Sequence, residues 1–219
     1  ACLALDLKPG DILWTSPITF VASANCALYC GATIDLVDIE SDTALISVKK
    51  LTEKLKQADK DGKLPKIIVP VHFSGQPCDM KEIYVLSQKY GFKIIEDAAH
   101  AIGATYQNKL IGNCQYSDIT VFSFHPVKLI TTGEGGAAMT NSSELSEKMT
   151  LLRSHGITRD VNMMQKKIDA PWYYEQIALG FNYRMTDIQA ALGISQLNRL
   201  DEYVVRRTEI SEWYENNLK

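Results

Sequence analysis

Two apolar runs flank a lysine in the stretch Thr120-Val-Phe-Ser-Phe-His-Pro-Val-Lys128-Leu-Ile-Thr-Thr-Gly-Glu-Gly-Gly136. The first run extends over residues 119–124 and is typical of a buried strand, and the second is a short run that opens after the glycines. The link between the two predicted strands is too short to contain a helix. The sheet that holds them is therefore predicted to be mixed.

Two interpretations of Lys128 are open. A lysine usually sits on a solvated helix face, whereas an amine shielded from water in a turn can attack a carbonyl. The alternative is an ordinary surface lysine at a strand end. The neighbouring Gly133, Gly135 and Gly136 favour positive φ and close backbone approach. They do not indicate a phosphate loop, because no Lys-Ser/Thr follows them and no GxGxxG spacing fits.

Strand-like and helix-like segments alternate on both sides of this stretch. The predicted strands cover residues 11–14, 33–37, 66–72, 92–97, 118–124 and 136–140. The predicted helices cover residues 20–30, 47–59, 80–90 and 143–154. Strands separated by helices of about ten residues predict an α/β fold with a mostly parallel sheet between helices.

The two ends of the chain differ from this alternating middle. Residues 1–7 predict the last turns of a helix that stops at Lys8-Pro9-Gly10-Asp11, and residues 159–174 predict a long loop. Periodic helices follow Asp187 and run to the last residue. We expect a fragment of a longer protein, with residues 1–195 in a large domain that lacks its N-terminal part. Residues 196–219 are then a helix leading to a smaller C-terminal domain that is absent.

Composition excludes several classes of function. The 219 residues carry 23 Lys plus Arg and 26 Asp plus Glu, a net charge of −3, which does not suggest binding to nucleic acid or an anionic membrane. No apolar stretch reaches the about 20 residues that span a bilayer. The five cysteines form no CxxC pair, so we expect reduced core cysteines in a cytoplasmic protein and no metal site.

Asp97 ends the apolar strand at residues 92–97, where ligands of open α/β sheets bind. A helix N-cap is the alternative role for an aspartate here. Together with Lys128, which follows another strand, it suggests one cofactor. Pyridoxal 5′-phosphate (PLP) is held by a lysine as a Schiff base, and a carboxylate keeps its ring nitrogen protonated.

Ordered blocks of residues then resemble the DegT/DnrJ/EryC1/StrS family of sugar aminotransferases. The blocks are residues 11–43, Val69 to Asp79, Ile95-Glu-Asp-Ala-Ala-His-Ala-Ile-Gly-Ala104, Phe122-Ser-Phe-His-Pro-Val-Lys128, Gly133-Glu-Gly-Gly136, Leu152-Arg-Ser-His-Gly156 and Gly180-Phe-Asn-Tyr-Arg-Met-Thr-Asp-Ile-Gln-Ala-Ala191. Each is weak alone, but they occur in family order over nearly the whole chain. The resemblance implies the type I fold of PLP-dependent transferases and a homodimer.

The resemblance also implies roles for four residues around the cofactor ring. Lys128 is the Schiff-base lysine and moves the proton between substrate and cofactor. Asp97 pairs with the ring nitrogen, His100 lies against the ring and its 3′-oxygen, and Phe20 stacks on the ring. A packing role in the core remains open for Phe20, and structural roles are expected for His72, His125 and His155.

Two further residues are implied in phosphate binding. Ser123 supplies a hydroxyl to the cofactor phosphate, and Asn182 reaches that phosphate from the partner subunit. Ser123 capping a turn and Asn182 opening a helix capped by Thr186 or Asp187 are the alternatives. The family's upstream phosphate-binding turn is expected to precede Ala1.

The implied reaction transfers an amino group from glutamate to a nucleotide-linked 4-keto-6-deoxy sugar. Residues 171–177 and 195–201 are similar to family members of pseudaminic acid biosynthesis, whose sugar is linked to UDP. Three alternatives are open: an aminotransferase for another nucleotide sugar, a PLP-dependent sugar dehydratase of the same family, and a sugar-nucleotide-binding module without chemistry. Lys128 argues against the dehydratases, which carry His in its place.

Overall fold

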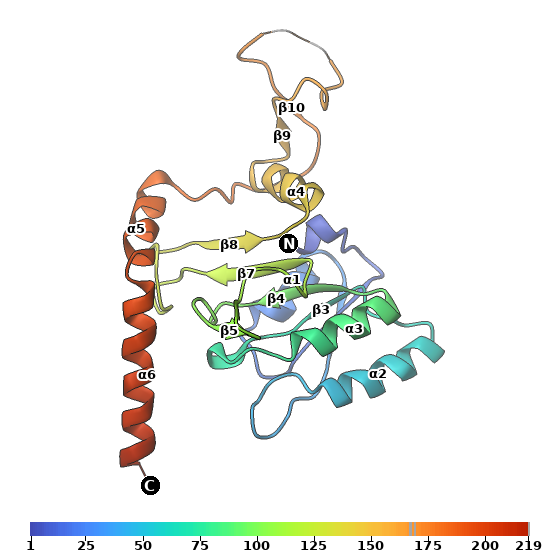
Figure 1. Cartoon of the computed structure of the whole chain (residues 1–219). Helices are drawn as coiled ribbons and strands as arrows, with labels where there is room; N and C mark the ends of the chain where they lie inside the picture. The colour runs from blue at the N-terminus through green and yellow to red at the C-terminus, as the bar shows by residue number, and fades with distance from the viewer. Residues whose placement is uncertain (167, 169, 219) are drawn as a thin grey trace.

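A six-stranded mixed sheet lies between two layers of helices in the computed structural model, which describes residues 1–166, 168 and 170–218 (Figure 1). Its strand order is β2-β1-β3-β4-β7-β8. The strands are β1 (Ile12–Thr15), β2 (Thr33–Leu36), β3 (Ile67–Val69), β4 (Lys93–Asp97), β7 (Ile119–Ser123) and β8 (Gly136–Met139). All pair in parallel except β8, which is antiparallel to β7. The predicted mixed, mostly parallel sheet is confirmed.

Helices cover both faces of the sheet. On one face lie α2 (Val48–Lys60) and α3 (Met80–Tyr90), and on the other lie α1 (Ala22–Tyr29), α4 (Ser143–Arg153) and the short 3₁₀ helix η1 (Cys2–Leu5). Two hydrophobic clusters, one per face, fill the space between the layers. Because both faces are covered, the central strands are apolar throughout rather than alternating.

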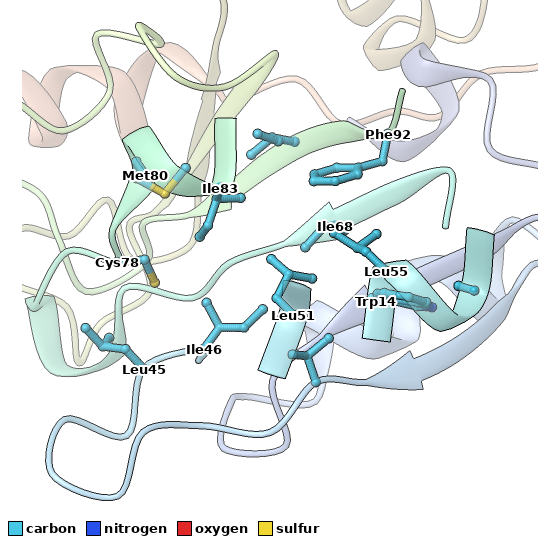
Figure 2. Close-up of a cluster of buried hydrophobic side chains, with 13 residues drawn as sticks. Trp14, Leu45, Ile46, Leu51, Leu55, Ile68, Cys78, Met80, Ile83 and Phe92 are labelled. Atoms are coloured by element: carbon cyan, nitrogen blue, oxygen red, sulfur yellow. The ribbon is translucent and has the colours of Figure 1, made fainter. Parts of the chain in front are cut away.

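The cluster under α2 and α3 shows why the sequence folds this way (Figure 2). Leu51 and Leu55 are four residues apart, so they share one face of α2, and both are fully buried against Trp14 and Ile68. Each such buried leucine contributes about 2 kcal/mol. Ser47 caps the helix, since its side chain accepts the Lys50 N–H.

The last two helices lie beside the edge of the sheet at which β7 ends (Figure 1). They are α5 (Asp187–Leu197) and α6 (Leu200–Asn217). Gln189 of α5 donates from Nε2 to the Glu134 carbonyl at 2.9 Å, which ties α5 to the loop between β7 and β8. Thr186 caps α5 and forms a capping box with Gln189. Of the two predicted caps, Thr186 and Asp187, the structure shows Thr186.

Some predicted elements differ in extent. Within residues 1–7 the chain forms the 3₁₀ helix η1 (Cys2–Leu5) rather than the end of an α-helix, and the left-handed φ of 57° at Asp6 ends it. Strand β3 ends at Val69, before Pro70, which has no N–H for a sheet ladder. The chain still continues beside β4, since Val71 bridges Asp97 in parallel.

Short hairpins were not predicted. β5 (Thr105–Tyr106) and β6 (Lys109–Leu110) pair antiparallel across a two-residue turn in which Gln107 and Asn108 both have positive φ. β9 (Ile157–Thr158) and β10 (Glu175–Gln176) pair at the base of the predicted loop 159–174. Positions 167 and 169 of that loop, and position 219, lie outside the described residues. The division at residues 195 and 196 stays a prediction.

All five cysteines are free thiols, and Cys2, Cys78 and Cys114 are buried, as expected for reduced core cysteines. In the described part of the chain, no helix is both long and apolar enough to cross a membrane.

Candidate active site

The carboxyl ends of four strands meet at one edge of the sheet, because β1, β3, β4 and β7 are adjacent and parallel. Asp97 is the last residue of β4, and Ser123 is the last residue of β7. Asp97 is in register with Val121, so the two polar residues end neighbouring strands. Such an edge is where open α/β sheets bind ligands.

Asp97 is half-buried, and both of its carboxylate oxygens accept a hydrogen bond. Oδ1 accepts the Ala99 N–H at 3.1 Å, and Oδ2 accepts the Ser23 hydroxyl at 2.5 Å. Ser23 belongs to α1, so the contact joins a helix to the end of β4. Each carboxylate oxygen has a second lone pair, so the group can accept a further donor from a ligand.

Lys128 is half-buried in the turn after β7, and its backbone N–H donates to the His125 carbonyl at 2.9 Å. Among the ion pairs of the described residues, none involves Lys128. The pKa of His100 is lowered, first by its partial removal from water and then by the positive charge of Lys128, while Asp97 acts in the opposite direction. The structure therefore brings these three predicted site residues within electrostatic reach of one another.

Phe20 lies just before α1, and its side chain is 74% exposed. It is not a core residue, so the open packing alternative is wrong and its ring faces are available. Ser123 accepts the His125 N–H at 3.3 Å, the turn-capping role that was left open, but the other lone pair and the proton of its hydroxyl stay available. Gly136 pairs with Ser123, and a Cβ there would lie 2.6 Å from the Phe122 carbonyl oxygen, so only glycine fits.

Asn182 follows the β9–β10 hairpin, which projects away from the sheet (Figure 1). It forms an antiparallel bridge with Ser154. The residues on either side donate from backbone N–H groups, Phe181 to Leu152 at 2.7 Å and Tyr183 to Arg153 at 2.9 Å. The backbone is thus fixed while the Asn182 side chain is exposed. Its predicted role from a partner subunit stays a prediction.

A second carboxylate, Glu96, lies on the opposite face of β4 and is buried. His72 Nε2 lies 2.8 Å from Glu96 Oε2, and the hydroxyls of Ser117 and Thr120 donate to Oε1. His72 Nδ1 accepts the Cys78 N–H at 3.1 Å, so the ring proton sits on Nε2 and points at Glu96. His72 is a fully buried structural histidine, as predicted.

The chain matches the DegT/DnrJ/EryC1/StrS aminotransferase family over residues 1–219. It belongs to this family. It is 42% identical over all of its length to the UDP-4-amino-4,6-dideoxy-N-acetyl-beta-L-altrosamine transaminase of Campylobacter jejuni and to the GDP-perosamine synthase of Caulobacter vibrioides, covering 54% of each. The chain thus spans about half the length of these curated relatives.

A solved structure gives the same result for the fold of this DegT/DnrJ/EryC1/StrS protein. Helicobacter pylori PseC, described as an aminotransferase involved in the biosynthesis of pseudoaminic acid, matches with a TM-score of 0.78 and 34% identity. The match covers 91% of this chain and 51% of PseC. The predicted fold of the type I PLP-dependent transferases is confirmed.

Sequence reasoning missed two polar residues of the candidate site in this aminotransferase-family chain, Ser23 and the nearby Thr19, whose hydroxyl oxygens are 2.8 Å apart. They are four residues apart around the start of α1, the spacing that puts side chains on one side of a helix. That spacing could have indicated that Thr19 and Ser23 lie close together. It does not indicate which strand α1 packs against, and so it does not lead to Asp97.

The hydrogen bonds that Glu96 accepts allow us to predict how the stability of this family member depends on pH. Burial acts to raise the pKa of Glu96, but hydrogen bonds from His72, Ser117 and Thr120 outweigh it, so the pKa is lowered. The carboxylate therefore stabilises the fold above its ordinary pKa, and this contribution is lost as pH falls through the lower folded value.

Urea unfolding between pH 3 and pH 7 checks this expectation. The free energy of unfolding of the wild type should fall on the acid side of that window, and in Glu96→Gln the fall should be smaller. Equal losses in the two proteins would contradict the role of Glu96.

Proposed function

We propose that this protein is a PLP-dependent aminotransferase that moves an amino group from glutamate to the keto carbon of a nucleotide-linked 4-keto-6-deoxy sugar. The observation that carries the proposal is that Asp97 ends β4, while Lys128 lies in the turn that follows the neighbouring strand β7. Membership of an aminotransferase family supports the reaction class.

The residues at this edge fit PLP. When bound, PLP supplies an aldehyde that takes up the amino group and a ring that withdraws electrons from the reacting carbon. The spare lone pairs of Asp97 suit a protonated ring nitrogen, and the exposed Phe20 offers a face for the ring. Ser123 at the end of β7 offers a hydroxyl for the phosphate, and His100 follows Asp97 by three residues, close enough for its pKa to respond to the charges of Asp97 and Lys128.

Lys128 has the chemistry for two steps. Its Nζ would hold PLP covalently, and the same Nζ, once free and neutral, would accept a proton from the reacting carbon and return it. The balance of the whole reaction is an exchange: glutamate loses its amino group and becomes 2-oxoglutarate, and the sugar ketone becomes an amine. No ion pair within the described residues competes for the Lys128 ammonium.

The finer proposal is a UDP-linked sugar, as in pseudaminic acid biosynthesis. It is supported by the C. jejuni and H. pylori relatives. A GDP-linked sugar is the second candidate, because the relative named a GDP-perosamine synthase is equally identical to this chain at 42%.

We further propose a homodimer that acts in the cytoplasm, with Asn182 completing the phosphate site of the partner subunit. The exposed Asn182 side chain on a fixed backbone supports the shared site. Free cysteines fit a reducing compartment. Residues 1–195 would form the cofactor-binding domain, and residues 196–219 would lead to a smaller one.

Isotope transfer tests the reaction and the sugar together. The protein is incubated with PLP, ¹⁵N-glutamate and either a UDP-linked or a GDP-linked 4-keto-6-deoxy sugar, and products are analysed by mass spectrometry. We expect ¹⁵N in the amino sugar from the UDP substrate. Label only in the GDP product would replace the finer proposal with the second candidate, and label in neither would refute both.

A further inference from the structure

Three side chains form a hydrogen-bonded chain that ends on Asp97. Thr19 Oγ1 lies 2.8 Å from Ser23 Oγ, and Ser23 Oγ lies 2.5 Å from Asp97 Oδ2. Thr19 is in the loop that leaves β1, Ser23 is in α1, and Asp97 ends β4. The chain therefore links three separate elements at the carboxyl edge of the sheet.

The donor and acceptor in each of these hydrogen bonds follow from the number of hydrogens that each group carries. A hydroxyl has one hydrogen, and an ionised carboxylate can only accept. Ser23 must therefore give its hydrogen to Asp97, and Thr19 must give its hydrogen to Ser23. Hydrogen bonds that end on a carboxylate are short and about twice as strong as neutral ones, in agreement with the 2.5 Å separation.

Burial makes the contact an effective restraint. Ser23 is only 5% exposed, so water does not compete for its hydroxyl. The Ala99 N–H holds the other oxygen, Oδ1, so the carboxylate is restrained at both oxygens by two different segments. A carboxylate fixed in this way cannot rotate freely and keeps its remaining lone pairs in one direction.

We propose that Ser23, supported by Thr19, is a positioning residue that orients the Asp97 carboxylate toward the ring nitrogen of the cofactor. This inference rests on the proposed function. Ser23 acts only through Asp97 and touches no reacting atom. Its removal should therefore weaken cofactor binding and alter the absorbance of bound cofactor, with no large change in folding.

The experiment titrates the apo-protein with PLP and follows absorbance to obtain Kd. Ser23→Ala should raise Kd about tenfold, the effect of losing one hydrogen bond to a charged group. Ser23→Thr, which keeps the hydroxyl, should restore most of the affinity. Ser87→Ala is the matched control: Ser87 is also 5% exposed, but it donates to the Tyr84 carbonyl within its own helix.

A double-variant cycle separates positioning from structure. In an Asp97→Asn background, Ser23→Ala should have little further effect on Kd, because the group it orients has been changed. An equal Kd for wild type and Ser23→Ala would overturn the inference. A tenfold rise in Kd caused by Ser23→Ala in the Asp97→Asn background would also overturn it.

The same titration distinguishes this failure from failure of the proposed function. If the wild type binds PLP and borohydride traps it on Lys128, the function stands whatever Ser23→Ala does. If the wild type neither binds PLP nor gives an adduct, the function fails, and the inference fails with it. Thermal unfolding of every variant checks that the fold is intact.

Discussion

Lys128→Ala is expected to reduce transamination by about 10⁴-fold or more, because in the proposed mechanism one side chain supplies both the nucleophile and the proton carrier. The absorbance of cofactor bound covalently to the protein should disappear at the same time. Lys128 is half-buried in a turn and is not part of a hydrophobic cluster, so the fold should survive its loss. Turnover from ¹⁵N-glutamate and the absorbance spectrum measure the two effects.

Lys56→Ala provides the comparison. Lys56 is exposed on α2, a helix outside the candidate site, so its loss should leave both turnover and spectrum unchanged. Undiminished turnover in Lys128→Ala would reject Lys128 as the reacting amine. A module that only binds nucleotide sugars would form no covalent bond to the cofactor. A borohydride-reduced wild-type peptide that carries the cofactor at Lys128 would therefore exclude the alternative of a binding module without chemistry.

His72→Leu is expected to lower the free energy of unfolding by about 3 kcal/mol, because it leaves a buried Glu96 carboxylate without one of its partners. The cost comes from the charge that remains and not from the lost ring alone. Urea unfolding at pH 7 measures it.

Two further variants make this expectation specific. His72→Leu combined with Glu96→Leu should lose less stability than His72→Leu alone, since no unpaired charge stays behind. His125→Leu, at an exposed histidine, should change stability little. A double variant less stable than the single one would show that Glu96 is not the source of the penalty.

Much of the fold could be predicted because its signals are local. The spacing of Leu51 and Leu55 fixes the buried face of α2, and apolar runs mark the central strands. The failures have equally local causes. Pro70 ends β3 early, and the β5–β6 turn depends on positive φ at Gln107 and Asn108, residues that less often mark such a turn than Asn-Gly.

The site was only partly predictable for a different reason. Asp97 and Lys128 could each be placed after a strand, but their nearness depends on the pairing of β4 with β7, which no local pattern specifies. Ser23 was missed because its meaning depends on which strand α1 faces. Contacts between segments far apart in the sequence depend on topology, as does the hydrogen bond between Ser23 and Asp97, which are separated by 74 positions.

The alternation of β4 places two consecutive acidic residues in different surroundings. Glu96 faces the α2–α3 layer and joins the strand ends to a buried histidine, whereas Asp97 faces α1 and the ligand edge. A residue that stabilises the scaffold is thus followed directly by one that, in the proposed function, holds the cofactor. Under the proposed function, a substitution at residue 97 would change the cofactor environment and leave the buried hydrogen bonds of Glu96 in place, so the two neighbouring positions can be varied for separate purposes.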